Sequence, residues 1–421
     1  MIDLARVRAA QRKLATAKAE SRTEALAFLA DIMREQDAAI DAANQRDLAA
    51  AADLEPQLKS RLALDAKKRA GLIEGLKQLV ASPDPIDVEV SRTKLDDGLM
   101  LTKVRSPIGV VLVIFESRPD AVIQIASLAV RSGNAVVLKG GSEATHSNRI
   151  LVDCVRKSLE RAGLDADAVM LVEGRAAVQE LLSRGDVIDL VIPRGSGQLV
   201  RSIQEGTRIP VLGHAEGICH LYIDAKADPA MAVQLAVDGK CDYPSACNAT
   251  ETILVHEAFL PHIGRVADAL GERGVELRVG ERLQSVLPRA KAASDDDFHT
   301  EYGALIVNMQ VVADIGEAIA HIARYGSAHT DAICTQDPGA AERFMREVDS
   351  ASVLHNASTR FADGFRYGLG AEVGVSTSRI HARGPVGVEG LLTTRWLLRG
   401  GGHIVSDYSS GAKRFKHERM K

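Results

Sequence analysis

Cys247 is the residue of this chain best suited to covalent chemistry. It follows a Pro-Ser pair within residues 242–252, after an expected helix that ends near residue 240 and before an expected strand. A thiol on a tight loop between elements is exposed enough to react, and backbone N–H groups in such a loop can face a developing oxyanion. A buried structural cysteine is the alternative, because that is the usual state of a lone thiol. Cys241 is the rival nucleophile, but its place at a helix end favours packing.

A glycine-containing segment at residues 195–200 is a candidate dinucleotide site. It has the pattern G-x-G-x-x-V at an expected strand-to-helix junction, so the third glycine of the standard fingerprint is missing. Small residues such as Gly195 and Ser196 at a helix N-terminus would still let a pyrophosphate approach backbone N–H groups. A plain turn explains the same residues equally well.

A second glycine pair lies just past the end of an apolar strand, in residues 138–143. Lys139 and Glu143 flank this pair, and Ser142 follows it directly. At the carboxyl end of a strand, Lys139 and Glu143 could bind ribose hydroxyls, and Lys139 could also meet a phosphate. The alternative is a solvent-facing loop that merely begins a helix. We expect this segment, including Ser142, to contact the cofactor.

Three arginines in loops indicate an anionic substrate. Arg118 follows the first strand of the expected sheet, Arg360 follows a late strand, and Arg383 lies further on in residues 381–385. Guanidinium groups pair bidentately with carboxylate or phosphate, so these residues are the candidate substrate-binding groups. Salt bridges between domains are the alternative for each of them.

The histidines do not indicate a metal site. His256 and Glu257 are followed by His262 at a spacing too long for H-E-x-x-H, and an intervening proline breaks the helix that such a motif needs. We therefore expect no metal. A structural role is the favoured interpretation for three others: His214, His220 and His381.

The elements that must position these side chains alternate between strands and helices from residue 108 onward. Continuous apolar strands separated by helices indicate a parallel sheet covered on both faces, and such sheets bind ligands at the carboxyl ends of their strands. The expected strands of a first sheet are residues 110–115, 135–138, 169–172, 187–192 and 210–212. The expected strands of a second sheet are residues 221–223, 252–255, 304–307, 332–334 and 353–355.

Helices and one hairpin precede the sheets. Residues 1 to about 80 are rich in Ala, Leu, Lys and Glu, and residues 21–24 form a capping box that predicts a helix start. Residues 88–90 and 100–104 flank an Asp-Asp-Gly turn at residues 96–98, which is a hairpin signal. Such a hairpin either serves subunit contact or is an ordinary edge hairpin.

Composition narrows the class of protein. At 421 residues the chain is too long for one ordinary core, so two domains are expected. A net charge of −4 indicates no large basic surface for nucleic acid, and five spread-out cysteines with no CxxC indicate reduced cytosolic thiols. The charged N-terminus is no signal peptide, and the longest apolar run, residues 107–115, is too short to span a membrane. We expect a cytoplasmic protein with neither nucleic-acid nor membrane partners.

Together, these motifs resemble gamma-glutamyl phosphate reductases, also called glutamate-5-semialdehyde dehydrogenases, a branch of the aldehyde dehydrogenase superfamily that acts in proline biosynthesis. The resemblance runs over nearly the whole chain, and so many matches in order are far more specific than any one of them. The matching segments are residues 107–110, 115–120, 131–135, 139–144, 192–195, 217–220, 246–252, 324–327, 356–361, 368–372 and 381–385.

The resemblance implies an α/β, aldehyde dehydrogenase-like fold. A Rossmann-type cofactor domain would comprise residues 1–90 and 104–217, and a second α/β catalytic domain would comprise residues 218–399. A small oligomerisation element would combine the hairpin at residues 91–103 with residues 400–421. A homo-oligomer, either a dimer or a tetramer, is therefore expected, and the upstream glutamate kinase is a candidate partner.

The resemblance also assigns roles in the site. Cys247 becomes the nucleophile, and its backbone N–H, together with Ser117 or Asn248, would stabilise the oxyanion. NADP is the implied cofactor. The implied ribose contacts are Lys139 and Glu143, with Glu301 near the nicotinamide ribose.

The implied reaction is the second step of proline biosynthesis from glutamate. L-glutamyl 5-phosphate would be reduced by NADPH to L-glutamate 5-semialdehyde through a cysteine thioester, with release of phosphate. Hydrolytic aldehyde dehydrogenases carry a glutamate that activates water, but in residues 212–217 that acid is displaced to Glu216. A hydrolytic aldehyde dehydrogenase and a non-catalytic scaffold are the alternatives. The displaced acid weighs against the first, and the intact Cys247 segment weighs against the second.

Overall fold

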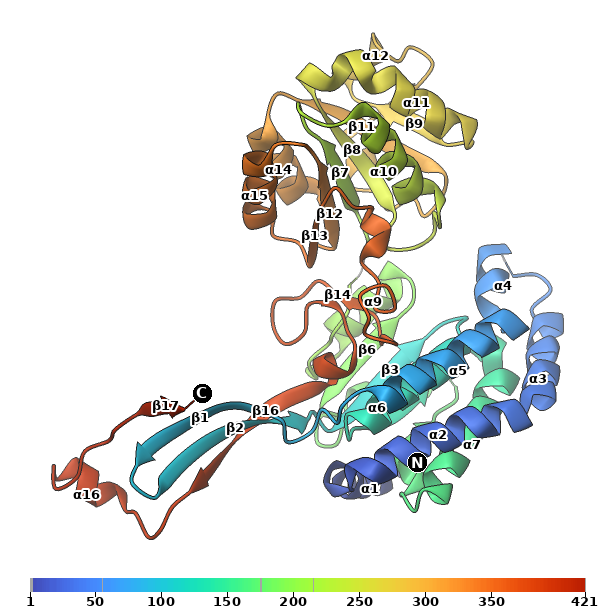
Figure 1. Cartoon of the computed structure of the whole chain (residues 1–421). Helices are drawn as coiled ribbons and strands as arrows, with labels where there is room; N and C mark the ends of the chain where they lie inside the picture. Colours follow the sequence, from blue (N-terminus) through green and yellow to red (C-terminus); the bar gives the residue numbers. More distant parts are fainter. Residues whose placement is uncertain (1–2, 55, 175, 215, 421) are drawn as a thin grey trace.

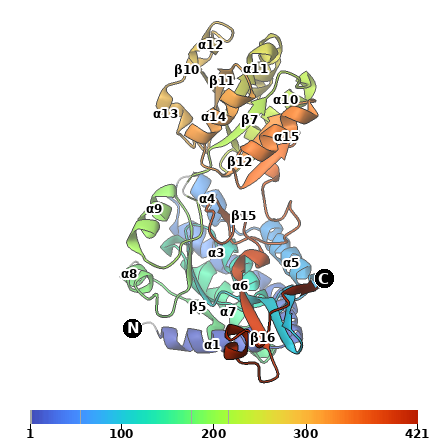
Figure 2. The ribbon, with the colours of Figure 1, turned by 90° about the vertical axis from the view of Figure 1, so that its left-hand side faces the viewer.

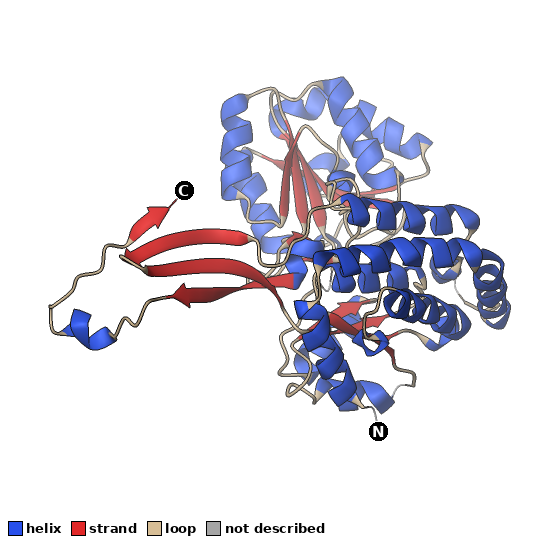
Figure 3. Cartoon of the chain, turned by 60° about the horizontal axis from the view of Figure 1, so that its bottom comes forward, coloured by secondary structure: helices blue, strands red, loops and turns tan. Residues whose placement is uncertain are grey.

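The computed structural model comprises two α/β lobes and a projecting antiparallel sheet (Figure 1). It describes residues 3–54, 56–174, 176–214 and 216–420. Each lobe is built around its own sheet of parallel strands, and Figure 3 shows the third sheet extending away from both. Within the described ranges, no helix is both long enough and apolar enough to cross a membrane.

A four-stranded parallel sheet forms the first lobe, in the order β5-β4-β3-β6. Its strands are β3 (Val110–Phe115), β4 (Ala135–Lys139), β5 (Val169–Leu171) and β6 (Leu190–Arg194). Every residue of β3 is buried, as expected for a strand with helices on both faces. The structure differs at the edge of the sheet, because Val211 makes only an isolated bridge to Val191 and residues 187–189 precede β6.

Helices from the N-terminus and from between the strands cover this sheet. α2 carries Leu26 and Leu29 into the same core as β3. The helix start expected at residues 21–24 is wrong, because the chain turns already at residues 17–18 and α2 begins at Ala19. The helices of this lobe are α1 (Leu4–Thr16), α2 (Ala19–Glu35), α3 (Asp37–Ala50), α4 (Pro56–Leu62), α5 (Ala66–Ala81), α6 (Asp120–Arg131), α7 (Thr145–Arg161), α8 (Ala176–Leu182) and α9 (Gly197–Gly206).

A seven-stranded sheet forms the second lobe, in the order β10-β9-β11-β8-β7-β12-β13, and its pairs are parallel. Its strands are β7 (Cys219–Ile223), β8 (Thr250–His256), β9 (Glu276–Val279), β10 (Lys291–Ala292), β11 (Ile306–Val312), β12 (Thr330–Cys334) and β13 (Ser352–His355). Its helices are α10 (Pro229–Cys241), α11 (Ile263–Glu272), α12 (Glu281–Gln284), α13 (Asp295–Phe298), α14 (Ile315–Tyr325) and α15 (Pro338–Glu347). The sequence predicts the five strands from β11 to β13 in this order but not β9 and β10, which are short and partly exposed.

The third sheet is antiparallel, with the strand order β16-β2-β1-β17. The hairpin expected at residues 96–98 is present, and Gly98 has the positive φ of 73° that its turn requires. Residues 392–399, expected in the catalytic domain, pair with β2 along its length, because β2 needs a partner for its second edge. The elements are β1 (Glu89–Asp96), β2 (Leu99–Pro107), β16 (Leu392–Arg399), α16 (Val405–Ser409) and β17 (Glu418–Met420).

The two lobes face each other across a short strand pair, β14 (Val375–Ser376) and β15 (Gly384–Pro385). In Figures 1 and 2 this pair, α4 and α9 lie on the side of the first lobe that faces the second. Val373 and Val386, beside the pair, pack into the core of the first lobe. The chain therefore returns from the second lobe to the first before it enters β16.

Candidate active site

A pocket of about 630 Å³ lies between the lobes. The end of β6 and the start of α9 line it from the first lobe, and the loop after α10 lines it from the second. The carboxyl end of a parallel strand is where such sheets bind ligands, so the pocket has the expected position. The expected site residues that line it are Arg118, Gly195, Ser196, Cys247, Asn248, Glu301 and Arg360.

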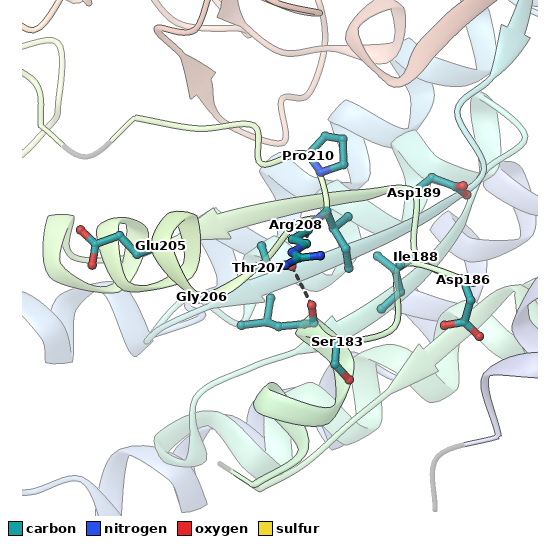
Figure 4. Close-up of a pocket in the computed structure, with 12 residues that line it drawn as sticks. Ser183, Asp186, Ile188, Asp189, Glu205, Gly206, Thr207, Arg208 and Pro210 are labelled. Atoms are coloured by element: carbon teal, nitrogen blue, oxygen red, sulfur yellow. Dashed lines mark hydrogen bonds between the residues drawn. The ribbon is translucent and has the colours of Figure 1, made fainter.

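A second hollow, of about 730 Å³, lies within the first lobe (Figure 4). Ile188 and Asp189 line it just before β6 begins, and Thr207 donates from its hydroxyl to the Leu182 carbonyl at 2.6 Å. This is the amino end of β6, whereas parallel sheets bind ligands at the carboxyl ends of their strands. The described residues around it include no cysteine or histidine. We therefore take the pocket between the lobes as the candidate site.

A tight loop between α10 and β8 presents Cys247. Backbone hydrogen bonds from Ala246 to Tyr243, at 3.1 Å, and from Ala249 to Ala246, at 2.9 Å, turn the chain twice before β8. The loop packs directly on Gly217, where an added Cβ would overlap the Cys247 carbonyl oxygen and lie 2.7 Å from its Cα. Glycine is therefore required at position 217 for the Cys247 backbone to lie where it does.

The side chain of Asn248, next to the cysteine, contacts backbone carbonyls. Its amide nitrogen donates to the Ala362 carbonyl at 2.9 Å and lies 3.5 Å from the carbonyl oxygen of Arg360. The amide therefore ties the loop of Cys247 to the segment that carries Arg360. This differs from the expected role, in which the same amide would face an oxyanion.

Two histidines from separate segments flank the sulfur of Cys247. Its Sγ, one ring nitrogen of His214 and one of His329 all lie within 4.8 Å of one another. The two rings meet edge to face, with centroids 4.8 Å apart. His214 Nδ1 donates to the Val375 carbonyl at 2.8 Å, and His329 Nδ1 lies 2.8 Å from the Thr330 hydroxyl. Each ring is thus held through Nδ1, which leaves Nε2 available for the sulfur.

The charges in this cluster favour a thiolate. Burial alone would raise the pKa of Cys247, but the charges of His329 and His214, with hydrogen bonds from both, hold it well below its ordinary value. Burial alone would lower the pKa of His214, yet the neighbouring Cys247 charge raises it to about 9. A thiolate beside an imidazolium is the reactive form of a cysteine nucleophile.

The other cysteines lack this activation. Burial raises the pKa of Cys154 to about 11 and that of Cys334 to about 12, and it raises the pKa of Cys219 as well. Burial also raises the pKa of Cys241, the rival nucleophile. Cys247 is therefore the cysteine whose surroundings favour reaction.

Two acidic groups hold the walls of the pocket together: Glu301, which lines it, and Glu251. Glu301 accepts a hydrogen bond from the Gly217 backbone N–H at 2.9 Å, and burial raises the pKa of this carboxyl. Glu251 pairs with the buried Lys240 at 2.7 Å and accepts from the Gly303 N–H at 3.3 Å. These contacts join the segment of Glu301 and Gly303 to Gly217, which precedes β7, and to Glu251, which follows the cysteine loop in β8.

The expected cofactor residues cluster at the carboxyl ends of β3 and β4. Ser117, with a positive φ of 47°, donates from its backbone N–H and its hydroxyl to the Glu143 carboxylate, at 2.6 and 2.8 Å. Lys139 ends β4, and its ammonium donates to the Gly140 carbonyl at 2.8 Å. Ser142 is exposed beside them. Ser117 is absent from the pocket's described lining, so the structure places it with the cofactor residues and not beside Cys247.

Arginines line the pocket together with acidic side chains. Arg118 pairs with Asp120 at 3.3 Å, and Arg360 pairs with Asp242 at 3.0 Å. Arg194, at the end of β6, also lines the pocket, and burial with the charge of Arg118 lowers its pKa. Among the described residues, no acidic side chain forms an ion pair with Arg194. The pocket therefore offers guanidinium groups to an anionic ligand.

Comparison with known proteins agrees with this geometry. Residues 2–289 match the aldehyde dehydrogenase family. The chain belongs to the aldehyde dehydrogenase family. It is 50% identical to a gamma-glutamyl phosphate reductase from Synechococcus sp. (strain RCC307), in an alignment that covers 97% of this chain and 92% of that protein.

Two solved structures share the fold over nearly the whole chain. A gamma-glutamyl phosphate reductase from Thermotoga maritima is 35% identical, with a TM-score of 0.92 over 95% of this chain and 98% of that one. A glyceraldehyde-3-phosphate dehydrogenase from Methanocaldococcus jannaschii, complexed with NADP, is 16% identical, with a TM-score of 0.69 over 94% and 93%. The second likeness shows the fold alone. The expected α/β, aldehyde dehydrogenase-like fold is thus confirmed.

One expected substrate residue of this aldehyde dehydrogenase lies elsewhere. Arg383 pairs with Asp349 at 2.6 Å and donates to the carbonyl oxygen of the same residue at 2.8 Å. It is absent from the pocket's described lining. The guanidinium of Arg383, just before β15, thus binds the loop that follows α15 in the second lobe. A loop arginine with a structural partner and one with a bound anion look alike in the sequence.

Sequence reasoning missed three residues of this aldehyde dehydrogenase site: Arg194 and His214 line the pocket, and the buried His329 flanks the cysteine sulfur. The sequence favours a structural role for His214 and gives no signal of its own for His329 or Arg194. Arg194 does lie inside one segment of the family resemblance, residues 192–195, and His329 lies just beyond another, residues 324–327. The family resemblance of those segments was the one indication in the sequence that these residues belong to the site. No local pattern marks them, because the three side chains come together only in the folded chain.

Proposed function

We propose that this enzyme reduces L-glutamyl 5-phosphate to L-glutamate 5-semialdehyde with NADPH, releasing phosphate, in the second step of proline biosynthesis from glutamate. The observation that carries the proposal is the cysteine between two histidines in an arginine-lined pocket between the lobes. The names of its full-length relatives support the same substrate. Under this proposal the first lobe binds the dinucleotide and the second supplies the nucleophile.

The residues at the pocket fit a bound NADPH. Beside Gly195 the Glu116 carboxylate fills the space that a Cβ would take and accepts from the Ser196 backbone N–H at 3.3 Å, so this carboxylate would have to move aside for a pyrophosphate to reach that N–H. Ser196 caps α9, a helix of ten residues whose N-terminus favours negative charge. Lys139 and Glu143 would hold a ribose, with Ser142 beside them. When bound, NADPH supplies the hydride that reduces the thioester.

Cys247 would carry the acyl group through the reaction. Its thiolate attacks the acyl carbon of the substrate, and phosphate leaves with the electrons of the broken C–O bond. The resulting thioester is reduced to a thiohemiacetal, which loses a proton from its hydroxyl and expels the thiolate to give the aldehyde. His214 and His329 stabilise the sulfur whenever it carries negative charge.

The surroundings of the thioester would protect it from water. In residues 212–217, of which Ala215 lies outside the described residues, Glu216 pairs with Arg201 at 2.5 Å and is not part of the pocket's described lining. His214 faces the sulfur instead, so the displaced carboxylate is not placed to activate water beside the thioester. This arrangement favours phosphate as the second acyl partner over hydrolysis.

Arginines would bind the two anionic ends of the substrate. Arg194 lies at the end of β6 and feels the charge of Cys247, so we assign the phosphate to it. Arg118 and Arg360 line the same pocket and are left for the α-carboxylate. Glu301 would lie near the nicotinamide ribose.

The activity is tested most simply in the oxidative direction. Purified protein is given L-glutamate 5-semialdehyde and NADP, and NADPH formation is followed with and without inorganic phosphate. We expect turnover to require phosphate, since the thioester needs an acyl acceptor. Turnover without phosphate would indicate a hydrolytic aldehyde dehydrogenase, and no turnover under either condition would indicate a scaffold. NAD in place of NADP tests the cofactor preference.

The projecting sheet would join two copies of the chain. Trp396 and Leu398, two residues apart on β16, point to the same face, and 57% and 58% of their surfaces are exposed. Exposed large apolar groups on an extended sheet are typical of an interface. We propose that this sheet, with residues 400–421, packs against a second copy.

We expect the double variant Trp396→Glu/Leu398→Glu to have a smaller molar mass in solution, because buried charge would disfavour the interface. Light scattering after size-exclusion chromatography measures this directly. Ile380→Glu is the matched control, since Ile380 is 88% exposed outside the sheet. A wild-type protein that is monomeric, or a double variant with unchanged mass, would contradict the assignment.

A further inference from the structure

The cysteine–histidine cluster has the composition of a site for a thiophilic metal ion. Cys247 Sγ and one ring nitrogen each of His214 and His329 lie within 4.8 Å of one another. Sulfur and imidazole nitrogen are the ligands that Zn²⁺ prefers, and three protein ligands with an open fourth position make a familiar four-coordinate arrangement. The cluster was not expected from the sequence, which indicated no metal.

The orientation of the rings supports ligation. His214 donates from Nδ1 to the Val375 carbonyl, a backbone acceptor of the kind that fixes metal-binding imidazoles and leaves Nε2 free. His329 is fully buried, and apart from the sulfur of Cys247 its Nε2 has no polar partner in the described part of the chain. A buried nitrogen without a partner is costly unless something binds it. Its Nδ1 already has Thr330 as a neighbour.

Only a modest adjustment separates this cluster from a coordination shell. With Zn–S near 2.3 Å and Zn–N near 2.0–2.1 Å, ligand atoms of a tetrahedron lie roughly 3.3–3.6 Å apart. The three atoms now lie within 4.8 Å of one another, so side-chain rotations that move them by about 1 Å would bring them into that range. The pocket leaves room on the open side for a water molecule as the fourth ligand.

We propose that Cys247, His214 and His329 form a binding site for Zn²⁺ or a similar thiophilic divalent cation, which reversibly blocks the enzyme. Binding makes one metal–sulfur bond and two metal–nitrogen bonds, and any protons on the sulfur or on Nε2 go to solvent. The metal-bound sulfur is then no longer free to attack a carbonyl. The blocking effect rests on the proposed function, whereas the binding itself does not.

The test measures binding and cysteine accessibility on the full-length chain, separately from turnover. Zn²⁺ is titrated against a chelator of known affinity, and alkylation of Cys247 by iodoacetamide is followed by peptide mass spectrometry. We expect one tight Zn²⁺ per chain, slowed alkylation of Cys247, and recovery on adding EDTA. Mg²⁺ should do neither, because it prefers oxygen ligands.

Ligand variants distinguish this site from adventitious binding. We expect His214→Gln and His329→Gln to weaken Zn²⁺ binding by at least roughly 10- to 100-fold, because that is the loss when only an outer-shell partner of a ligand is removed and each of these variants removes a ligand. His262→Gln, on an exposed histidine outside the pocket, is the matched control and should bind as the wild type does. Thermal unfolding curves verify that each variant is folded.

Two outcomes would overturn the proposal. One is Zn²⁺ binding that both ligand variants retain at wild-type strength, which would mean an adventitious ion only. The other is unchanged alkylation of Cys247 in the presence of bound Zn²⁺. If Zn²⁺ protects Cys247 but the phosphate-dependent assay shows no turnover, the metal site stands and the proposed reaction fails.

Discussion

Replacing Cys247 by alanine is expected to lower phosphate-dependent turnover by more than about 10⁴-fold, because removal of a covalent nucleophile costs up to roughly 10⁶-fold in comparable enzymes. The variant should still fold, since the side chain lies at the surface of the pocket and not in a core cluster. Steady-state kinetics with L-glutamate 5-semialdehyde, NADP and phosphate measures the loss. Binding of NADPH, followed by fluorescence, should persist.

Cys241 provides the matched control for this prediction. It lies at the end of α10, six positions before the nucleophile, and burial raises its pKa. Cys241→Ala is therefore expected to keep near wild-type turnover. An active Cys247→Ala protein together with an inactive Cys241→Ala protein would transfer the nucleophile to the helix end and remove the role assigned to the two histidines.

Gly217→Ala is expected to reduce kcat/KM by at least about 10²-fold, the loss associated with a displacement of roughly 1 Å at a reacting group. An alanine Cβ would overlap the Cys247 carbonyl oxygen and lie 2.7 Å from its Cα, so one of the two segments must move. Gly217 is also fixed from behind by Glu301, which limits how far it can retreat. The cysteine loop is therefore the part that shifts.

The rate of Cys247 alkylation separates displacement from unfolding in this variant. A displaced sulfur leaves the two histidines and should react more slowly, while the thermal transition remains cooperative. Gly264→Ala is the control, because the space around Gly264 in α11 is open and alanine favours helix by up to about 1 kcal/mol. Wild-type kinetics in Gly217→Ala would show that the close packing on Cys247 is not needed.

The sequence predicts the central strands well because their signal is local. β3, β4, β7 and β12 are short apolar runs bounded by helices, and burial on both faces requires such runs. β9 is missed because it is only four residues long and carries charged residues at positions that are only partly buried. β16 is placed in the wrong unit because its partner, β2, is almost 300 residues earlier, and pairing over that distance leaves no local pattern.

The sequence predicts a site residue only where a reactive or charged side chain also stands in a turn or loop next to an expected strand. The turn around Cys247 marks a reactive thiol, and Arg118 and Arg360 do line its pocket. His214 and His329 carry no such mark, because one follows the first sheet and the other precedes β12, and the fold alone brings them to the sulfur. Arg383, by contrast, is outside the described lining of that pocket, where its ion pair with Asp349 joins two chain segments.

The most direct test of the central claim is to trap the acyl group on the enzyme. Protein mixed with L-glutamate 5-semialdehyde and NADP, without phosphate, is quenched in acid and analysed by peptide mass spectrometry. We expect a glutamyl thioester on the peptide that contains Cys247, and we expect phosphate added before the quench to remove it. An adduct on another residue, or none at all in protein that turns over with phosphate, would contradict the account.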